Sequence, residues 1–264
     1  MNVFEAALLG IVQGLTEFIP ISSSGHLVIG QYLFNGGSDH LFLEFINIGT
    51  VIALLIYFRK KIIAILQDIF VNKKYDLARN IVITALPAGL IGFLFADFIA
   101  STAFFNNIWV VVVTLALVGV LMIVLEKLPK ESYVKNGERL SIKRALIIGF
   151  AQVCALVPGV SRSGSTIIAG RFMGLKPAEA AEYSFLVSIP IMLGVTAKVF
   201  LKASDRAYFA ANWEMLVVGN VMALISGLIA IGFLMKYLAR HDLSIFGWYR
   251  VGLAALVLTV LLLQ

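Results

Sequence analysis

Residues 6–30 read AALLGIVQGLTEFIPISSSGHLVIG, and residues 145–169 read ALIIGFAQVCALVPGVSRSGSTIIA. Aligned without a gap at an offset of 139, the two stretches share identical residues at Ala6/Ala145, Gly10/Gly149, Gln13/Gln152, Ser22/Ser161, Ser24/Ser163 and Gly25/Gly164. Each stretch is an apolar run interrupted by a proline and followed by a cluster of serine and glycine. Interrupted hydrophobic segments at matching places in two halves indicate a polar site near the middle of a membrane.

The composition is that of a protein embedded in lipid. Of the 264 residues, 60% are hydrophobic and 14% are charged, against about 25% charged residues in soluble proteins. The mean hydropathy is +0.96. We therefore expect an all-α integral membrane protein with a single membrane domain over residues 1–264. The net charge of +6 is explained by anionic lipid headgroups beside the membrane spans, so membrane lipids are expected partners and nucleic acid is not.

Six apolar runs are long enough to cross the hydrocarbon core, which takes about 20 helical residues. They cover residues 41–58, 81–100, 108–125, 183–201, 215–235 and 246–263. Three of them fall in each half, so the chain is predicted to consist of internal repeats at approximately 1–130 and 140–264. Because each repeat has an odd number of spans, the second is predicted to lie inverted relative to the first.

Basic residues orient this topology. The predicted loops at 59–80 and 126–144 are rich in lysine and arginine, whereas those at 35–40 and 101–107 carry neither. The positive-inside rule places the first two in the cytoplasm and the other two outside. By alternation, 171–182 and 236–245 are cytoplasmic loops and 202–214 is an external loop.

The two interrupted stretches, 6–34 and 145–174, are then predicted to be re-entrant helical hairpins that enter from opposite faces. Pro20 and Pro158 would end the first arms, and serine would cap the second arms. The free N–H groups and the positive helix end suit a phosphate. The expected phosphate-binding residues are Ser22, Ser24, Gly25, Ser161, Ser163, Gly164 and Thr166.

Ionisable residues inside membrane segments are candidates for function because burying them is costly. Gln13 and Glu17 lie four residues apart and share a helix face, which suits a divalent cation or a general base. A packing hydrogen bond between helices is the simpler alternative. Glu44 and Glu182 lie near span ends, where hydration would explain them. Arg250 is expected to be interfacial, with its head reaching toward water.

A hydroxyl, an imidazole and a guanidinium accompany this pair. Ser23 and His26 lie within one predicted helical turn, and a serine becomes a nucleophile when a base activates it. Arg162 offers a planar fork for phosphate oxygens, although an ion pair with Glu17 is an alternative. Ser23 and Arg162 are equivalent in the repeat, so both would meet near its two-fold axis.

These motifs, Gln13-x-x-x-Glu17 with Pro20-x-Ser-Ser-x-Gly25-His26 and the later Pro158-Gly-x-Ser-Arg-Ser-Gly164-x-Thr166, resemble the bacterial undecaprenyl-diphosphatase family, also called bacitracin-resistance proteins. The resemblance covers essentially the whole chain. It implies removal of the terminal phosphate from undecaprenyl diphosphate, which recycles the carrier lipid of cell-wall synthesis.

The resemblance further implies catalytic roles for Glu17, Ser23, His26 and Arg162, assisted by Mg²⁺ or Ca²⁺, with Glu17 and Gln13 as candidate metal ligands. Some members have glutamate where this chain has Gln13, which weakens any scheme that needs two acidic ligands. A homodimer in the bacterial plasma membrane, with an active site that opens to the external face, is also implied.

The mechanism expected from these residues is attack by Ser23 on the terminal phosphorus, with His26 or Glu17 assisting proton transfer. His26 as nucleophile and direct attack by water are variants that the sequence leaves open. The rival function is a secondary transporter or lipid flippase, because inverted repeats with broken helices are typical of transporters.

Overall fold

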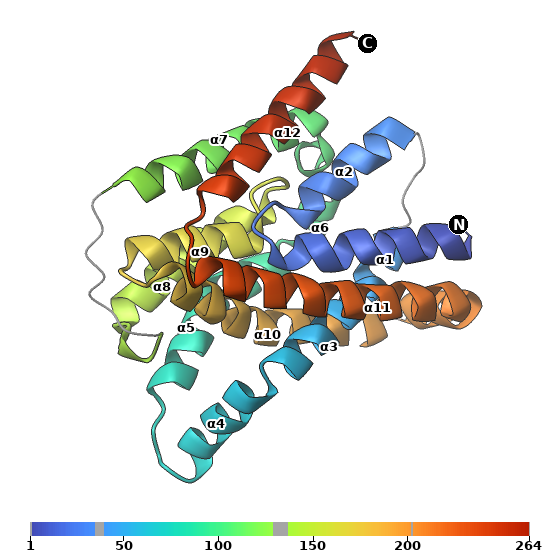
Figure 1. Ribbon diagram of the computed structural model, residues 1–264. Coiled ribbons are helices and arrows are strands. Elements are labelled where there is room, and N and C mark those ends of the chain that lie inside the picture. The colour runs from blue at the N-terminus through green and yellow to red at the C-terminus, as the bar shows by residue number, and fades with distance from the viewer. Residues whose placement is uncertain (1, 35–39, 129–136, 202, 264) are drawn as a thin grey trace.

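A computed structural model describes residues 2–34, 40–128, 137–201 and 203–263. All regular structure in these ranges is helical (Figure 1). The helices are α1 (Val3–Phe18), α2 (Ser23–Phe34), α3 (His40–Tyr57), α4 (Arg59–Phe70), α5 (Asp76–Leu94), α6 (Ala96–Ser101), η1 (Ala103–Asn106), α7 (Ile108–Lys127), η2 (Gly137–Arg139), α8 (Ile142–Val153), η3 (Cys154–Leu156), α9 (Arg162–Phe172), α10 (Pro177–Leu201), α11 (Ala203–Leu238) and α12 (Ser244–Leu263).

Length and hydropathy mark five helices in the described ranges as membrane spans: α5, α7, α10, α11 and α12. The bent pair α3 and α4, with an angle of 69° between them, makes up to six. Five of the six predicted spans coincide with one helix each, whereas 81–100 covers the end of α5, the break at Phe95 and most of α6. A multi-pass membrane protein is confirmed. Helices α1, α2, α8 and α9 have 16 residues or fewer, short of the roughly 20 that a span requires.

Two segments predicted as loops are helical instead. Residues 59–70 of the predicted 59–80 loop form α4, an amphipathic helix that begins with an arginine and two lysines and continues with mostly apolar residues around Gln67 and Asp68. Such a helix suits a membrane interface. The described part of the predicted external loop 202–214 belongs to α11, which is kinked at Asn212. Both predictions were wrong because charge and polarity were taken as signs of irregular structure.

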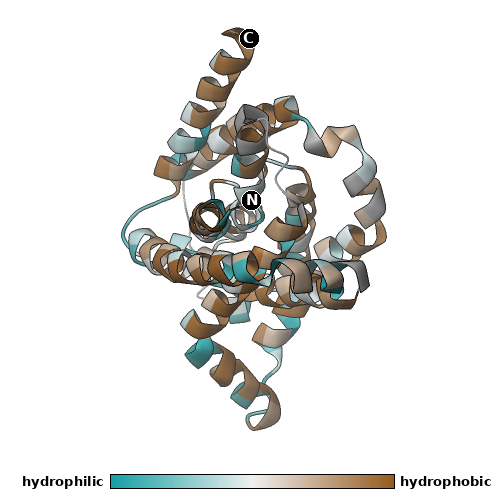
Figure 2. Cartoon of the chain, turned by 90° about the vertical axis from the view of Figure 1, so that its right-hand side faces the viewer, coloured by the Kyte–Doolittle hydropathy of each residue, from teal (hydrophilic) through white to brown (hydrophobic). Residues whose placement is uncertain are grey.

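The outer faces of the spans are apolar. Along α11 the exposed hydrophobic residues recur every four positions, at Val217, Val221, Ile225, Ile229 and Phe233. This spacing places them on one face of the helix. Figure 2 shows hydrophobic colouring along much of the length of the helices. Burial of the opposite face and exposure of this one are what a helix between protein and lipid requires.

The helices pack across the two halves of the sequence. Helix α1 lies against α11, α8 lies against α5, and α7 lies against α12. The breaks between α1 and α2 and between η3 and α9 come together near the centre of the molecule (Figure 1). A Cβ built on Gly25 of the first break would lie 3.5 Å from the Cα of Gly159 in the second. The two breaks therefore touch.

Candidate active site

The two breaks share one backbone turn, centred on a serine. Ser22 and Ser161 both adopt positive φ, at 74° and 75°, a conformation that costs a non-glycine residue about 1–3 kcal/mol and is concentrated at functional sites. The hydroxyl of Ser22 accepts the backbone N–H of Gly25 at 3.2 Å, and that of Ser161 accepts the N–H of Gly164 at 3.0 Å. The prediction that serine caps the second arm is confirmed in both breaks.

The serines on either side of Ser23 and Arg162 hydrogen-bond to each other within their own turns. Ser22 Oγ lies 3.3 Å from Ser24 Oγ, and Ser161 Oγ lies 3.2 Å from Ser163 Oγ. Ser22 and Ser163 are buried, whereas Ser24 is exposed. Four of the serines expected to bind phosphate thus form two matching hydrogen-bonded pairs that shape the turns.

Glu17, at the end of α1, is the centre of the site. Its Oε2 accepts the Ser23 hydroxyl at 2.8 Å. Its Oε1 accepts Nη2 of Arg162 at 2.7 Å, forming an ion pair. One carboxylate therefore holds both the hydroxyl of the first break and the guanidinium of the second. The structure brings together the two side chains that the repeat places at equivalent positions.

Gln13 extends this network into α3. Its Nε2 donates to Glu17 Oε2 at 3.1 Å and to Oδ1 of Asn47 at 2.7 Å. The predicted sharing of one helix face by Gln13 and Glu17 is confirmed. Asn47 was missed by the sequence analysis, although a polar amide within an apolar span is a signal that could have found it.

The guanidinium of Arg162 keeps a free donor. Its Nη2 contacts Glu17 and also Sδ of Met192 at 3.4 Å. Its Nη1 is buried and has no hydrogen-bond partner within the described chain. A buried, unsatisfied donor is costly, so this nitrogen would gain from an acceptor oxygen entering the site.

His26 makes its hydrogen bonds to groups outside the Glu17 network. Its Nδ1 lies 2.7 Å from the carbonyl oxygen of Ser22, and its Nε2 lies 2.7 Å from the hydroxyl of Tyr249. Because the carbonyl accepts a hydrogen bond only from a protonated Nδ1, the other nitrogen, Nε2, accepts the hydrogen bond that the Tyr249 hydroxyl donates. The structure thus pairs Ser23 with Glu17 and pairs His26 with Tyr249, a residue that the sequence analysis did not consider.

Thr166 lies one helical turn after Arg162 on α9. Its hydroxyl is within 2.5 Å of the Ser184 hydroxyl on α10 and donates to the carbonyl of Arg162 at 2.8 Å. These contacts anchor α9 to α10. Of the expected phosphate-binding residues, Thr166 is therefore the one whose hydroxyl is committed to helix packing.

Arg250 corrects a sequence expectation. It was expected at the interface, but its exposed fraction is 0%. Its guanidinium donates to the backbone carbonyls of Pro20, Gly159 and Val160. The error arose because a lone arginine in an apolar run is usually accommodated by reaching for water, and no local signal reveals carbonyls that lie far away in the sequence.

The oxygen donors around Glu17 suit Mg²⁺ or Ca²⁺, which prefer carboxylate and amide oxygens. In the described part of the chain, no three histidine, cysteine, aspartate or glutamate side chains gather to hold a metal. One carboxylate with neighbouring amides matches the way Mg²⁺ is bound in many phosphate enzymes, where the substrate supplies further ligands. A cation here would have the Glu17 carboxylate as its one acidic protein ligand and would need further oxygens from the substrate.

Other charged residues lie apart from this network. Glu182 pairs with Lys61 at 3.1 Å, and both side chains are about one-third exposed, as expected for a hydrated span end.

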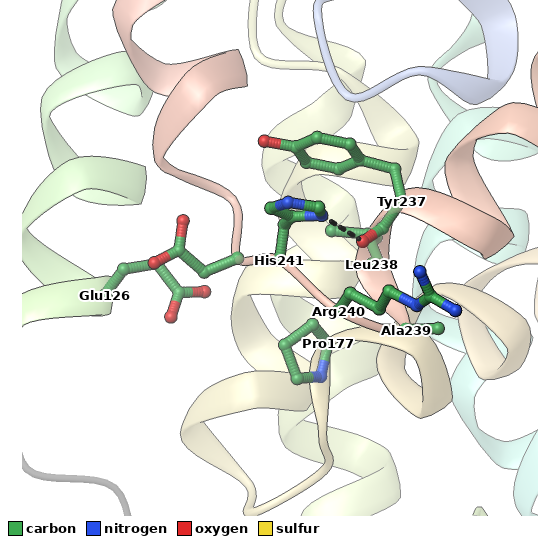
Figure 3. A pocket seen from close by; sticks show the side chains of 8 residues that line it. Glu126, Pro177, Tyr237, Leu238, Ala239, Arg240 and His241 are labelled. Carbon is green, nitrogen blue, oxygen red and sulfur yellow. Dashed lines mark hydrogen bonds between the residues drawn. The ribbon is translucent and has the colours of Figure 1, made fainter.

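A pocket of about 500 Å³ is lined by Glu126, Tyr237, Arg240, His241 and Asp242 together with apolar neighbours (Figure 3). None of the residues around Glu17 lines this pocket.

Comparison with known proteins identifies the family to which the chain belongs. The sequence model described as "Bacitracin resistance protein BacA" matches residues 6–256. The chain is 38% identical to an undecaprenyl-diphosphatase of Rubrobacter xylanophilus, with 100% of both chains covered. It is 38% identical to undecaprenyl-diphosphatase 1 of Clostridioides difficile, covering 98% of this chain and 96% of the relative. A Thermodesulfovibrio yellowstonii undecaprenyl-diphosphatase is 40% identical, with 97% and 96% covered. The resemblance seen in the motifs is confirmed, and the chain belongs to the bacitracin resistance protein BacA family.

Proposed function

We propose that this protein is a membrane phosphatase that hydrolyses undecaprenyl diphosphate to undecaprenyl phosphate and inorganic phosphate. The printed names of the relatives supply the substrate. The observation that carries the proposal for this chain is the Glu17 carboxylate, which accepts both Ser23 Oγ and Arg162 Nη2. A carboxylate on a serine hydroxyl, beside a guanidinium with a free donor, is a set of groups for phosphoryl transfer.

In the proposed reaction Ser23 attacks the terminal phosphorus. Glu17 is within hydrogen-bond reach of the hydroxyl and accepts its proton as the O–P bond forms. The bond to the bridging oxygen breaks, and the lipid monophosphate leaves. Water then hydrolyses the phosphoserine and returns the hydroxyl. We assign proton transfer to Glu17 rather than His26 because the serine hydroxyl is bonded to Glu17.

Arg162 is proposed to hold the transferred phosphate. Its unpartnered Nη1 would donate to an equatorial oxygen, and such charge stabilisation dominates phosphoryl transfer. Ser22, Ser24, Gly25, Ser161, Ser163 and Gly164 form the two turns around it and are proposed to shape the phosphate cradle.

A divalent cation, Mg²⁺ or Ca²⁺, would be held by Glu17, with Gln13 and Asn47 as further oxygen donors. When bound, it would neutralise charge on the diphosphate. Gln13 presents Nε2 to Glu17, so its oxygen reaches a cation only after the amide turns over.

We also propose that the fold is an inverted repeat with two re-entrant hairpins. Support comes from the reciprocal packing of α1 on α11 and of α8 on α5, since α11 is the counterpart of α5 at an offset of 139. The matching turns at Ser22 and Ser161 add to it. The homodimer and the opening to the external face remain predictions from the family resemblance. The transporter alternative does not need Ser23 bonded to a carboxylate, and we do not propose it.

Phosphate release by purified protein tests the proposal. In detergent, where no gradient exists, the parent should release phosphate from undecaprenyl diphosphate. Glu17→Gln should lower the rate by at least about a hundredfold, because a general base typically contributes 10²–10⁴-fold. Glu182→Gln is the matched control, since this carboxylate pairs with Lys61 outside the site. No release by the parent, or equal loss in both variants, would contradict the proposal.

A further inference from the structure

Arg250 contacts both breaks but takes no part in the proposed reaction. It is the largest side chain in the described chain with almost no exposed surface. Its Nη1 donates to the Pro20 carbonyl at 3.2 Å, and its Nη2 donates to the carbonyls of Gly159 and Val160, the latter at 3.1 Å. These three hydrogen bonds all go to backbone carbonyls. A single guanidinium therefore spans both breaks.

The chemistry of the breaks explains why an arginine is needed there. Where a helix is broken, some backbone carbonyls lose their partner within the helix, and lipid offers no water to replace it. Arginine carries five donors in a rigid fork and can serve several carbonyls at once. The adjacent Pro158 carbonyl is satisfied separately, by the hydroxyl of Thr114 at 2.8 Å. Together Arg250 and Thr114 bind one carbonyl of the first break and three of the second.

The crossing of α7 and α12 positions the Arg250 side chain. A Cβ built on Gly247 would lie 2.7 Å from the carbonyl oxygen of Gly119, so the helices approach more closely than side chains would permit. Small residues at a crossing allow such contact between membrane helices. Arg250 lies three residues after Gly247, on the same face of α12. The close approach of α7 and α12 at these glycines thus places the Arg250 side chain against both breaks.

We propose that Arg250 is a positioning residue that keeps the two breaks in register. Pro20 lies three residues before Ser23, and Val160 lies two residues before Arg162. By binding the carbonyls of both breaks, Arg250 sets where the hydroxyl and the guanidinium meet at Glu17. This role rests on the proposed function, since Ser23 and Arg162 are the groups being aligned.

Hydrogen exchange tests the role without any reaction. In detergent, Arg250→Met should raise amide exchange of residues 19–25 and of residues 157–164 by at least about tenfold each. Arg171→Lys is the control for an altered buried arginine, because Arg171 binds Glu126 and the Leu175 carbonyl. It should change neither segment. Faster amide exchange in only one break, or in neither, would overturn the proposal.

Kinetics per folded molecule give the second readout. The kcat of Arg250→Met should fall about tenfold to hundredfold, because misplacement by about 1 Å costs rates of that order, while KM stays within about threefold. Arg250→Lys should retain more activity than Arg250→Met, because an ammonium donates to one break but cannot span both. An unchanged kcat would overturn the role even if both breaks loosen.

The proposed function and the proposed role of Arg250 can be refuted independently of each other. If the parent releases no phosphate, the proposed function fails, and the exchange measurement still decides whether Arg250 joins the breaks. If Arg250→Met does not fold, Arg250→Lys takes its place in both experiments. It should raise exchange in at least one break by about threefold and lower kcat, and a variant indistinguishable from the parent would refute the role.

Discussion

The first break, at residues 19–25, and the second, at residues 157–164, share a turn at one serine but differ in side chains and at the equivalent positions Pro20 and Gly159, of which Gly159 has a φ of 86°. Ser22 and Ser161 share a positive φ and the same capping bond to a glycine. At the next position the first break has a hydroxyl, Ser23, and the second has a guanidinium, Arg162. The carboxylate that binds both, Glu17, corresponds in the second half to Leu156. The duplicated backbone is thus a shared scaffold, and a few substituted positions divide the chemistry between its two copies.

The largest effect is expected at the hydroxyl of the first break. Ser23→Ala removes the proposed nucleophile and leaves Glu17 paired with Arg162. We expect phosphate release to fall by about a thousandfold or more, with folding unchanged, because the smaller side chain leaves the turn intact. The exposed Ser101→Ala is the control. A burst of lipid monophosphate from the Ser23→Ala variant would show that water or His26 attacks instead.

The guanidinium of the second break should matter next. Arg162→Lys keeps the charge but removes the fork that reaches Glu17 with one nitrogen and phosphate with the other. We expect kcat to fall by about a hundredfold, which corresponds to about 2.7 kcal/mol of transition-state stabilisation. Arg79→Lys, an exposed residue paired with Asp76, should leave kcat unchanged. A change confined to KM would show that Arg162 binds substrate and transition state equally.

The two equivalent glutamines give the sharpest comparison. Gln13 bridges Glu17 and Asn47, whereas Gln152 is buried with neither side-chain atom hydrogen-bonded within the described residues. Gln13→Leu should lower kcat about tenfold by releasing the carboxylate. Gln152→Leu should leave kcat unchanged and raise thermal stability, because an unsatisfied buried amide costs about 1–3 kcal/mol. Equal effects of the two changes would contradict this division between the halves.

The smallest effect is expected at the partner of His26. Tyr249→Phe removes one hydrogen bond, which is worth about 1 kcal/mol or about fivefold at most. Since Ser23 is bonded to Glu17, phosphate release should fall by about threefold or less. A hundredfold loss, measured in the same assay, would show that the histidine and tyrosine pair takes part in proton transfer. An increase would indicate that Tyr249 masks a reactive His26.

Much of this site could be foreseen because its signals are local. Proline followed by serine and glycine predicts a broken helix with a capped second arm, and both breaks have that form. The repeat predicted that Ser23 and Arg162 would meet, and Glu17 joins them. The pairing of His26 with Tyr249 and the burial of Arg250 had no such signal, and the amide of Asn47 gave a signal of polarity but none of its partner. Each depends on a partner from a distant helix.

The sequence alone determined the membrane class, the six apolar segments and the cluster of polar residues at two interrupted helices. Hydropathy and turn chemistry are properties of a few neighbouring residues, so they can be read from the chain directly. Only the tertiary structure decided which polar groups bind each other. Arg250 and Pro20 lie 230 residues apart, and their contact exists because α7 and α12 cross at glycines beside both breaks. Buried polar groups take whichever partner packing provides, and packing is a property of the whole chain.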